Sequence, residues 1–344
     1  MSEQTLAGQR LADWTTLRLG GRATRFVEVT SRAELYDVVA ACDETGEPVL
    51  VLGGGSNVVV ADEGFDGTVV RVATGGVATG GDACGGVEVV VEAGEPWDDL
   101  VEQSVRSEWI GFEALSGIPG TVGGTPIQNV GAYGQEVAET VAQVHVYDRL
   151  ERRTRTMFNA DCAFGYRSSV FKQTPGRYVV GAVTFQLRHG NLGAPIQYAE
   201  LARSLGIEIG DRVESARVRD AVLALRRGKG MVLDPTDHDT WSAGSFFTNP
   251  FVAADEVPDG APAYAQADGS VKTSAAWLVE HAGFAKGHGN ARVSLSTKHT
   301  LALTNRGEAR TADLLDLAAE VREGVRSVFG IQLHPEPVLI GCTL

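Results

Sequence analysis

The sequence predicts a fold of mixed helices and strands that is not a dinucleotide-binding Rossmann fold, and two observations carry this prediction. First, a glycine turn (Gly53 to Gly55) follows the apolar strand predicted at 48–52, but the next residues, Val58 to Val60, are β-branched and predict another strand. A Rossmann site needs a helix at that point. Second, five glycines fall between 111 and 124, which excludes a regular helix or strand there because interior glycine is destabilising.

One strand and one helix are predicted before the first glycine turn. Residues 25–29 (RFVEV) have strand character, and Ser31 is a candidate helix N-cap with Glu34 as its capping-box partner. Gly46 suits the C-cap of the same helix. The apolar side chains between the two caps recur at helical spacing, at Leu35, Val38, Val39 and Cys42.

Strands predominate in the middle of the chain, where alternating and continuous apolar patterns predict them at 68–73, 87–92, 141–147 and 177–187. A helix is predicted at 96–107, with Pro96 near its first turn. We place the end of the first domain near residue 205.

The second part of the chain is predicted to mix helices and strands. Its elements are a basic helix at 216–227, a helix at 272–283, a strand at 299–304 and an amphipathic helix at 311–329. The last helix has its apolar face at Leu314, Leu315, Ala318, Val321, Val325 and Val328.

Composition excludes several classes of protein. The apolar fraction of 43% is ordinary for a folded chain, so the body should not be disordered. A net charge of −14 argues against a general nucleic-acid binder, which needs a basic surface to replace phosphate counterions. No apolar run is long enough for a membrane span, and the N-terminal segment lacks the pattern of a signal peptide. We therefore expect a soluble, cytoplasmic protein, and a monomer because no coiled-coil heptads occur.

The cysteines and histidines do not predict a metal site. Cys42, Cys84, Cys162 and Cys342 are too widely spaced for a zinc or redox motif and suit reduced thiols. The seven histidines form no metal-binding pair such as HExxH. No metal is expected.

Three polar residues are candidates for chemistry, although each has a plain structural alternative when taken alone. Arg167 lies in a polar segment and could be a surface ion-pair residue. Ser245 precedes apolar residues and could be a helix N-cap. Glu336 lies between two prolines and could be an exposed turn residue. The glycine loops could be tight turns, or they could let backbone N–H groups approach a phosphate.

Five segments together resemble one enzyme family. They are LGGGSN (52–57), SGIPGTVGGTPIQNVGAYG (116–134), GYRSSVFK (165–172), GSFFTNP (244–250) and HPEPVLIG (334–341). In order and spacing they are similar to the motifs of the UDP-N-acetylenolpyruvoylglucosamine reductase family, and the resemblance runs from about residue 15 to 341. The positions of Tyr133 and Tyr198 are similar to those of the first subtype of the family. In that subtype, a tyrosine on a loop folds over the substrate.

The resemblance implies a domain arrangement. An FAD-binding domain at 1–205 would consist of two α+β subdomains, about 1–70 and 71–205, of the vanillyl-alcohol oxidase and p-cresol methylhydroxylase type. A substrate-binding α+β domain would follow at 206–330. Residues 331–344 would carry a final strand that returns to the FAD-binding domain.

The resemblance also implies a reaction, in which NADPH reduces FAD and the flavin reduces the enolpyruvyl group of UDP-N-acetylglucosamine enolpyruvate. Arg167 would hold the substrate carboxylate, since a guanidinium can form a bidentate fork with it. A protonated Glu336 would hydrogen-bond the developing charge, and Ser245 would protonate the carbon. The implied substrate contacts are Tyr133, Tyr166, Tyr198, Lys229 and Asn249. The stretch from Lys229 to Ser245 is longer than in the family, which leaves the diphosphate contact of Lys229 open.

The two glycine-rich loops would hold FAD, with their backbone groups at its pyrophosphate. The residues implied are Gly53, Gly54, Gly55, Ser56, Asn57, Ser116, Gly117, Ile118, Pro119, Gly120, Gly123, Gly124, Asn129, Gly131 and Ala132. No motif for NADPH is present, and the family lets nicotinamide use the substrate site.

Two other functions remain open. One is an oxidase of the same fold, but these enzymes often attach flavin to a histidine or cysteine, and the glycine loops contain neither; Cys84 lies outside them. The other is a non-catalytic nucleotide-sugar binder, which would not need Arg167, Ser245 and Glu336 together.

Overall fold

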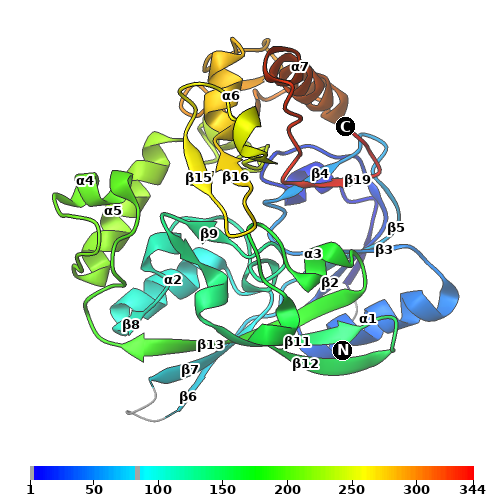
Figure 1. Ribbon diagram of the computed structural model, residues 1–344. Helices are drawn as coiled ribbons and strands as arrows, with labels where there is room; N and C mark the ends of the chain where they lie inside the picture. The colour runs from blue at the N-terminus through cyan, green and yellow to red at the C-terminus, as the bar shows by residue number, and fades with distance from the viewer. Residues whose placement is uncertain (1–3, 82–85) are drawn as a thin grey trace. The chain divides into compact units, whose positions relative to one another are not determined.

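The computed structural model describes residues 4–81 and 86–344, so Cys84 lies outside the described residues. The chain divides into two compact units, each made of several segments (Figure 1). The first comprises 1–9, 23–54 and 66–227, and the second comprises 10–22, 55–65 and 228–344. These limits put 206–227 in the first unit and 331–344 in the second. The functional division into cofactor and substrate domains stays a prediction.

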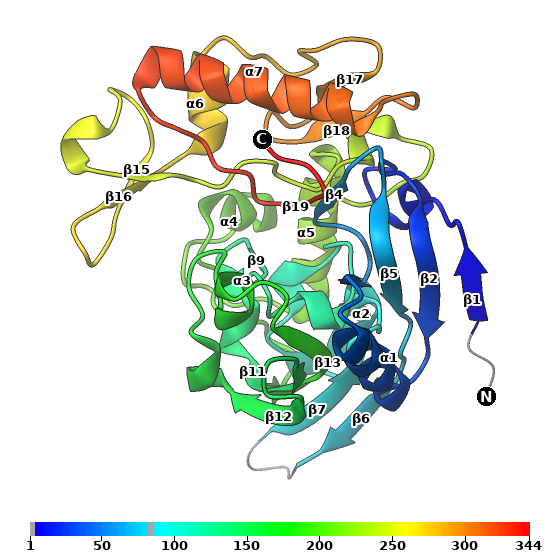
Figure 2. The same ribbon diagram turned by 90° about the vertical axis from the view of Figure 1, so that its right-hand side faces the viewer.

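The first unit contains a four-stranded sheet in the order β1-β2-β5-β3, formed by Gln4–Ala7, Ala23–Val29, Phe65–Val72 and Val49–Leu52. Figure 2 shows β1, β2 and β5 of this sheet side by side. Helix α1 (Arg32–Thr45) connects β2 to β3. The Oγ of Ser31 accepts the Glu34 N–H at 3.2 Å, and Gly46 ends the helix with φ 72°, so both predicted caps are confirmed.

A larger sheet in the same unit has the order β12-β11-β13-β7-β6. Its strands are Arg153–Phe158, Val141–Asp148, Tyr178–His189, Val87–Glu92 and Val77–Gly80, and the short β8 (Trp109–Ile110) pairs with the end of β13. Tyr36 of α1 stacks on Tyr147 of β11, with 5.8 Å between ring centroids. A Cβ at Gly181 would lie 2.1 Å from the Tyr36 hydroxyl, so glycine at this position lets the helix approach the sheet.

The other helices of the first unit are α2 (Trp97–Arg106), α3 (Val170–Gln173), α4 (Ala199–Leu205) and α5 (Ser215–Gly228). Short 3₁₀ helices lie at Glu113–Leu115, Val122–Gly124, Val137–Glu139 and Asn159–Cys162. The residues 129–136 form a hairpin with β9 (Gly131–Ala132) and β10 (Gln135–Glu136). One apolar core joins both sheets, α1 and α2.

The second unit has its own core around α6 (Ala275–His281) and α7 (Thr311–Phe329). Three small sheets surround these helices. They are the parallel pair β4 (Val58–Val60) and β19 (Val338–Ile340), the triplet β14 (Phe251–Val252), β16 (Val271–Thr273) and β15 (Ala263–Ala265), and the pair β17 (Val293–Leu295) and β18 (Leu303–Asn305). Short 3₁₀ helices lie at Leu11–Trp14, His238–Thr240 and Ala254–Glu256.

Three predictions for the second half need correction. The helix predicted at 272–283 begins later, because Val271–Thr273 is a strand and the Ser274 side chain caps the helix by accepting the Trp277 N–H. Most of the strand predicted at 299–304 is a loop, and β18 begins at Leu303. On α7, Val328 is 57% exposed and Leu315 is half-buried, since Leu317 belongs to the buried face instead.

Candidate active site

The two glycine-rich loops approach each other backbone to backbone in the first unit. A Cβ at Gly54 would lie 2.6 Å from the Cα of Gly120, and one at Gly53 would lie 2.5 Å from Oγ1 of Thr121. No side chain fits between these segments without moving one of them. The glycines are therefore needed for the close packing of the two loops.

Several amides of the second loop are bonded within the chain. The Gly117 N–H donates to Oδ1 of Asp98 at 2.6 Å, and the Gly123 N–H donates to the Ala93 carbonyl at 2.8 Å. The buried Ser116 hydroxyl donates to the Glu113 carbonyl at 2.7 Å. These groups shape the loop. The assignment of these three residues as cofactor contacts stays a prediction.

Asp98 of α2 holds this loop by accepting the Gly117 N–H. Besides Gly117 it accepts two hydrogen bonds from Arg219 of α5, at 2.7 and 3.0 Å. Burial alone would raise the pKa of Asp98, but the hydrogen bonds from Arg219 and Gly117 outweigh burial and hold the pKa below its ordinary value. The carboxylate therefore stays ionised and joins α2, α5 and the glycine loop.

The far end of the first loop belongs to the second unit. The Gly55 carbonyl accepts the Thr16 N–H at 3.1 Å, and a Cβ at Gly55 would lie 1.9 Å from the Trp14 carbonyl oxygen. The Asn57 carbonyl accepts the Val338 N–H at 3.0 Å, at the start of the β4–β19 pair. Backbone contacts thus hold the residues on both sides of Ser56.

Asn129 organises the turn that carries Arg167. Its side-chain amide donates to Oε2 of Glu136 at 2.7 Å and to the Gly165 carbonyl at 3.1 Å, while its Oδ1 accepts the Ala138 N–H at 3.1 Å. The side chain is buried and joins the β9–β10 hairpin to the Gly165 turn. Its role as a cofactor contact stays a prediction, since these bonds already use both ends of the amide.

Arg167 lies in this turn with a left-handed backbone, φ 50°. Its Nη2 donates to the Gly131 carbonyl at 2.7 Å, and its guanidinium carbon lies 5.3 Å from the centroid of the Tyr166 ring. The side chain is half-buried. The guanidinium is therefore oriented by β9 and Tyr166, which differs from the surface ion-pair arginine that the sequence left open.

Tyr133 occupies the tip of the hairpin. Tyr133 and Gly134 have φ values of 49° and 87°, the backbone of a two-residue turn in which both residues are left-handed. The Tyr133 and Tyr198 rings meet edge to face, with centroids 5.6 Å apart. Tyr198 is 47% exposed and lies directly before α4. The first unit thus brings together two of the predicted substrate contacts.

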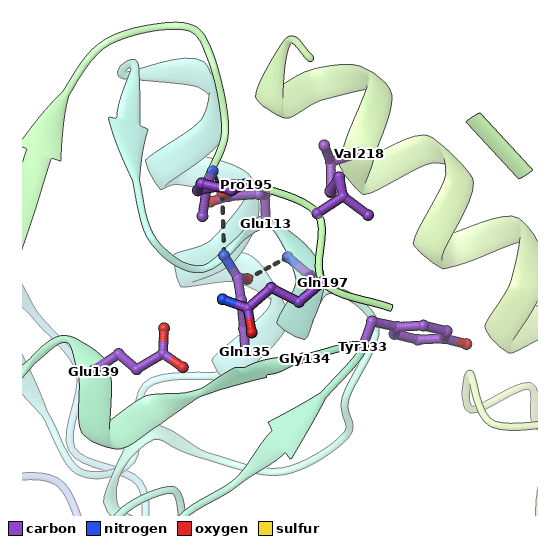
Figure 3. Close-up of a pocket in the computed structure, with 11 residues that line it drawn as sticks. Glu113, Tyr133, Gly134, Gln135, Glu139, Pro195, Gln197 and Val218 are labelled. Atoms are coloured by element: carbon purple, nitrogen blue, oxygen red, sulfur yellow. Dashed lines mark hydrogen bonds between the residues drawn. The ribbon is translucent and has the colours of Figure 1, made fainter. Parts of the chain in front are cut away.

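A small pocket lies beside Tyr133 (Figure 3). Its wall includes Glu113, Gln135 and the segment 194–197, all from the first unit. Arg226 of α5 is buried and interacts electrostatically with Tyr133 and Asp98; burial lowers its pKa to about 10. The sequence placed Arg226 in a basic helix but did not single it out. Its helical spacing of seven from Arg219 was the available signal.

In the second unit, Ser245 and Glu336 are brought together by backbone pairing. Phe247 and Pro335 form an antiparallel bridge, and the Glu336 N–H donates to the Phe246 carbonyl at 2.8 Å. The Thr248 N–H donates to the His334 carbonyl at 3.1 Å. Ser245 therefore begins an extended segment, and the alternative that it caps a helix is wrong.

A histidine that the sequence did not indicate lies near Ser245. The Oγ of Ser245 and Nε2 of His299 are 3.4 Å apart. The loop of His299 is fixed by the buried Asp239, which accepts the Thr297 N–H at 3.0 Å and an Arg306 N–H at 2.9 Å. Because the partners come from distant segments, no local motif pointed to this pair.

The other predicted substrate contacts of the second unit have different surroundings. Oδ1 of Asn249 accepts the Ala275 N–H at 2.9 Å, so its oxygen caps α6 and its amide N–H₂ faces elsewhere. Lys229 is half-buried just after α5. Neither role in substrate binding is decided by these contacts.

Within residues 4–81 and 86–344, no group of three or more His, Cys, Asp or Glu side chains is arranged to bind a metal ion. In the same ranges, no helix combines the length and the apolar character needed to cross a bilayer.

Comparisons with known proteins agree with the resemblance in the motifs. An FAD-binding domain matches residues 23–155, and the C-terminal domain of UDP-N-acetylenolpyruvoylglucosamine reductase matches residues 234–340. The reductase of Cutibacterium acnes is 60% identical over 97% of this chain and 90% of its own length. The reductase of Thermobifida fusca is 58% identical over 97% of both chains. The crystal structure of the Thermus caldophilus reductase has a TM-score of 0.67 at 27% identity and covers 99% of both chains.

The fold, the glycine loops and the matched domains define an FAD-binding oxidoreductase of mixed helix and sheet. The α+β prediction is confirmed at this level. The chain belongs to the UDP-N-acetylenolpyruvoylglucosamine reductase family, whose cofactors are FAD and NADPH and which acts in peptidoglycan precursor synthesis on a nucleotide-sugar substrate.

The residues present fit a bound FAD. The contact of Gly54 with Gly120 makes a cradle that any Cβ would fill, and main-chain groups are the donors that a pyrophosphate requires. The backbone of Gly53, Gly54 and 118–120, all in the first unit, would hold the pyrophosphate.

Proposed function

We propose that this chain reduces the enolpyruvyl double bond of UDP-N-acetylglucosamine enolpyruvate with electrons from NADPH, giving UDP-N-acetylmuramate. A bound FAD would supply the hydride chemistry that links NADPH to the terminal carbon of the enolpyruvyl group. The observation that carries the proposal is the pairing of residues 246–248 with 334–336, because it joins the two short segments that hold Ser245 and Glu336.

Arg167 has the task of holding the substrate carboxylate. One guanidinium nitrogen is engaged with the Gly131 carbonyl, which limits the rotation of the side chain. A guanidinium held in this way keeps its charge and loses less entropy when it forms further hydrogen bonds. As negative charge develops beside the carboxylate, a fixed cation stabilises it without reorganisation.

Ser245 has the task of donating a proton to the carbon next to the carboxylate, and Glu336 that of hydrogen-bonding the charge that spreads into the carboxylate. A serine hydroxyl is a weak acid, but a carbanion-like carbon is a strong base, so a well-placed hydroxyl suffices. His299, 3.4 Å from the hydroxyl, can receive or return its proton. Glu336 can act as donor if it is protonated when the substrate excludes water.

Tyr133, Tyr166, Tyr198, Lys229 and Asn249 are proposed to bind the nucleotide sugar. The Tyr133–Tyr198 pair supports this role, because an exposed phenol on a segment beside a fixed one can pack over a ligand. We also infer a monomer that works in the cytoplasm and does not bind nucleic acid. The net charge of −14 and the free thiols of Cys42, Cys162 and Cys342 suit this inference.

The test is an anaerobic titration followed by the flavin absorbance. NADPH should bleach the flavin, and UDP-N-acetylglucosamine enolpyruvate should restore it. Ser245→Ala should still be bleached by NADPH but should lose recovery by about 10²–10⁴-fold, the range of general acid catalysis. Full recovery in Ser245→Ala would refute the proton-donor role. A flavin that returns with oxygen but not with the sugar would indicate an oxidase, and a protein unable to take up FAD would indicate a nucleotide-sugar binder.

A further inference from the structure

Glu113 is a buried carboxylate that the proposed mechanism does not use. It lies in the 3₁₀ helix before the second glycine loop and is 1% exposed. Its oxygens accept the Gly111 N–H at 2.8 Å, the side-chain amide of Gln135 at 3.2 Å and the Ala194 N–H. All three groups donate, so they suit an ionised carboxylate, and a buried charge is retained only when it is satisfied in this way.

Gln135 connects this carboxylate to the hairpin that presents Tyr133 (Figure 3). Its Oε1 accepts the Ala114 N–H at 2.8 Å, which fixes the orientation of the amide and directs Nε2 to Glu113. Gln135 is the first residue of β10, and the two-residue turn before it contains Tyr133. The hairpin tip therefore depends on the position of Glu113.

Ala194 connects the same carboxylate to the segment that presents Tyr198. A Cβ at Gly193 would lie 2.9 Å from Oε1 of Glu113, so glycine is what allows this close approach. The same segment is also bonded to the loop at 211–213. The Gly193 N–H donates to the Val213 carbonyl at 2.8 Å, and the Ile196 N–H donates to the Asp211 carbonyl at 2.9 Å. Tyr198 follows four residues after Ala194 and is exposed.

We infer that Glu113 is a positioning residue that holds the Tyr133 hairpin and the Tyr198 segment in register, so that the two rings meet as a pair ready to close over the nucleotide sugar. The inference rests on the proposed function, since it requires the two tyrosines to contact substrate. It extends that function to a residue that touches neither substrate nor cofactor.

The experiment compares Glu113→Gln with Glu139→Gln. The second carboxylate lines the same pocket, but it accepts the Glu136 N–H, a hydrogen bond that a glutamine can still make. In Glu113→Gln, both carboxylate positions face donors, the Gly111 N–H on one side and the Ala194 N–H on the other. The new N–H₂ therefore faces a donor in either orientation of the amide. We expect hydrogen exchange of the 193–198 amides to become about tenfold to hundredfold faster, the loss expected for a hydrogen bond to a charged group.

The kinetic readout separates positioning from general damage. In Glu113→Gln the KM for the enolpyruvyl nucleotide sugar should rise about tenfold, while the rate of flavin reduction by NADPH stays within about twofold, because lost ground-state binding raises KM selectively. Gly193→Ala, which moves the segment but keeps the carboxylate, should change KM and exchange in the same direction. It provides the test if Glu113→Gln does not fold.

Unchanged exchange at 193–198 in both variants would overturn the inference, and so would faster exchange with an unchanged KM. If Glu113→Gln lowered both the rate of flavin reduction by NADPH and the thermal stability, the role of Glu113 would be structural only, and the inference would fail. If the wild-type protein does not reduce the sugar, the proposed function fails and the substrate role fails with it. Exchange at Ala194 would then still decide whether Glu113 holds the segment.

Discussion

The hydroxyl of Ser245 lies 3.4 Å from Nε2 of His299. The loop that carries His299 is held by the buried Asp239, which accepts the Thr297 N–H. If Ser245 donates a proton during turnover, its alkoxide must recover one, and His299 is placed to supply it. Removing the imidazole should therefore slow the substrate half-reaction and leave the NADPH half-reaction intact.

We predict that His299→Ala slows recovery of the flavin by the enolpyruvyl sugar about tenfold to hundredfold, within the range of general acid–base groups. Stopped-flow absorbance measures the two half-reactions separately. His281→Ala is the matched control, because His281 stacks on Trp277 at 3.8 Å on the surface of α6 and should leave both rates unchanged. Equal slowing of both half-reactions by His299→Ala would contradict the prediction.

Gly54→Ala should weaken FAD binding, because its Cβ would lie 2.6 Å from the Cα of Gly120 and both neighbours are main chain. Overpacking of this kind costs about 1–3 kcal/mol, or roughly a tenfold to hundredfold loss of affinity if it displaces the cradle. Fluorescence titration of the apoprotein with FAD measures the change. Gly80→Ala is the control, since a Cβ there meets nothing within 4 Å. Wild-type affinity in Gly54→Ala would show that the cradle is not the FAD site.

Asn129→Asp keeps the size and the left-handed backbone of the residue but removes the donors to Glu136 and Gly165. We expect a loss of about 1–3 kcal/mol in the free energy of unfolding, because a carboxylate then faces two acceptors, and a lower kcat/KM because the Arg167 turn loses its support. Adding Glu136→Gln restores one donor. The double variant should regain stability but not kcat/KM, since the Gly165 carbonyl still lacks its donor. Recovery of both together would contradict the role of Asn129 in placing Arg167.

Asp148 predicts a dependence of stability on pH. Its carboxylate is fully buried and accepts hydrogen bonds from Arg177 at 3.1 and 2.9 Å and from Arg155 at 3.3 Å. The hydrogen bond from Arg177 is the main cause of a lowered pKa. Because the folded pKa is below the unfolded value, this contribution is present above about pH 4 and is lost as pH falls through the folded pKa.

The corresponding variant is Asp148→Asn, which should lower the free energy of unfolding by about 1–3 kcal/mol near pH 7, because the buried side chain loses its charge and its N–H₂ then faces groups that also donate. The difference from wild type should shrink at acid pH, where the wild-type carboxylate is protonated. Urea titrations at several pH values measure both effects, and the exposed Asp37→Asn serves as control. A difference that does not shrink at any acid pH at which the protein stays folded would show that the ion pair is not its source.

Local signals predicted the elements that local physics determines. The caps of α1 at Ser31 and Gly46 and the whole of α7 follow from residues within the element itself, and the structure confirms them. The edge strand β12 was missed, because its sequence RTRTMF is mostly polar and becomes a strand by pairing with β11. The strand Val271–Thr273 likewise depends on two neighbours and was taken for helix.

The site divides in the same way. The motifs around Arg167, Ser245 and Glu336 were recognised from the sequence, and their catalytic roles stay predictions. The Ser245–His299 contact and the Glu113–Ala194 bond join residues far apart in the chain, so no spacing in the sequence pointed to them. The left-handed turn at Tyr133 was also missed, since a tyrosine is rarely expected in that conformation.

The parallel pairing of β4 with β19 has a consequence for synthesis of the protein. A ribosome synthesises Val58 long before Val338, yet each strand completes the hydrogen bonds of the other. The Asn57 carbonyl, at the end of the first glycine loop, likewise accepts its hydrogen bond from the Val338 N–H. A nascent chain that stalls before β19 therefore can form neither this strand pair nor the backbone bond at Asn57.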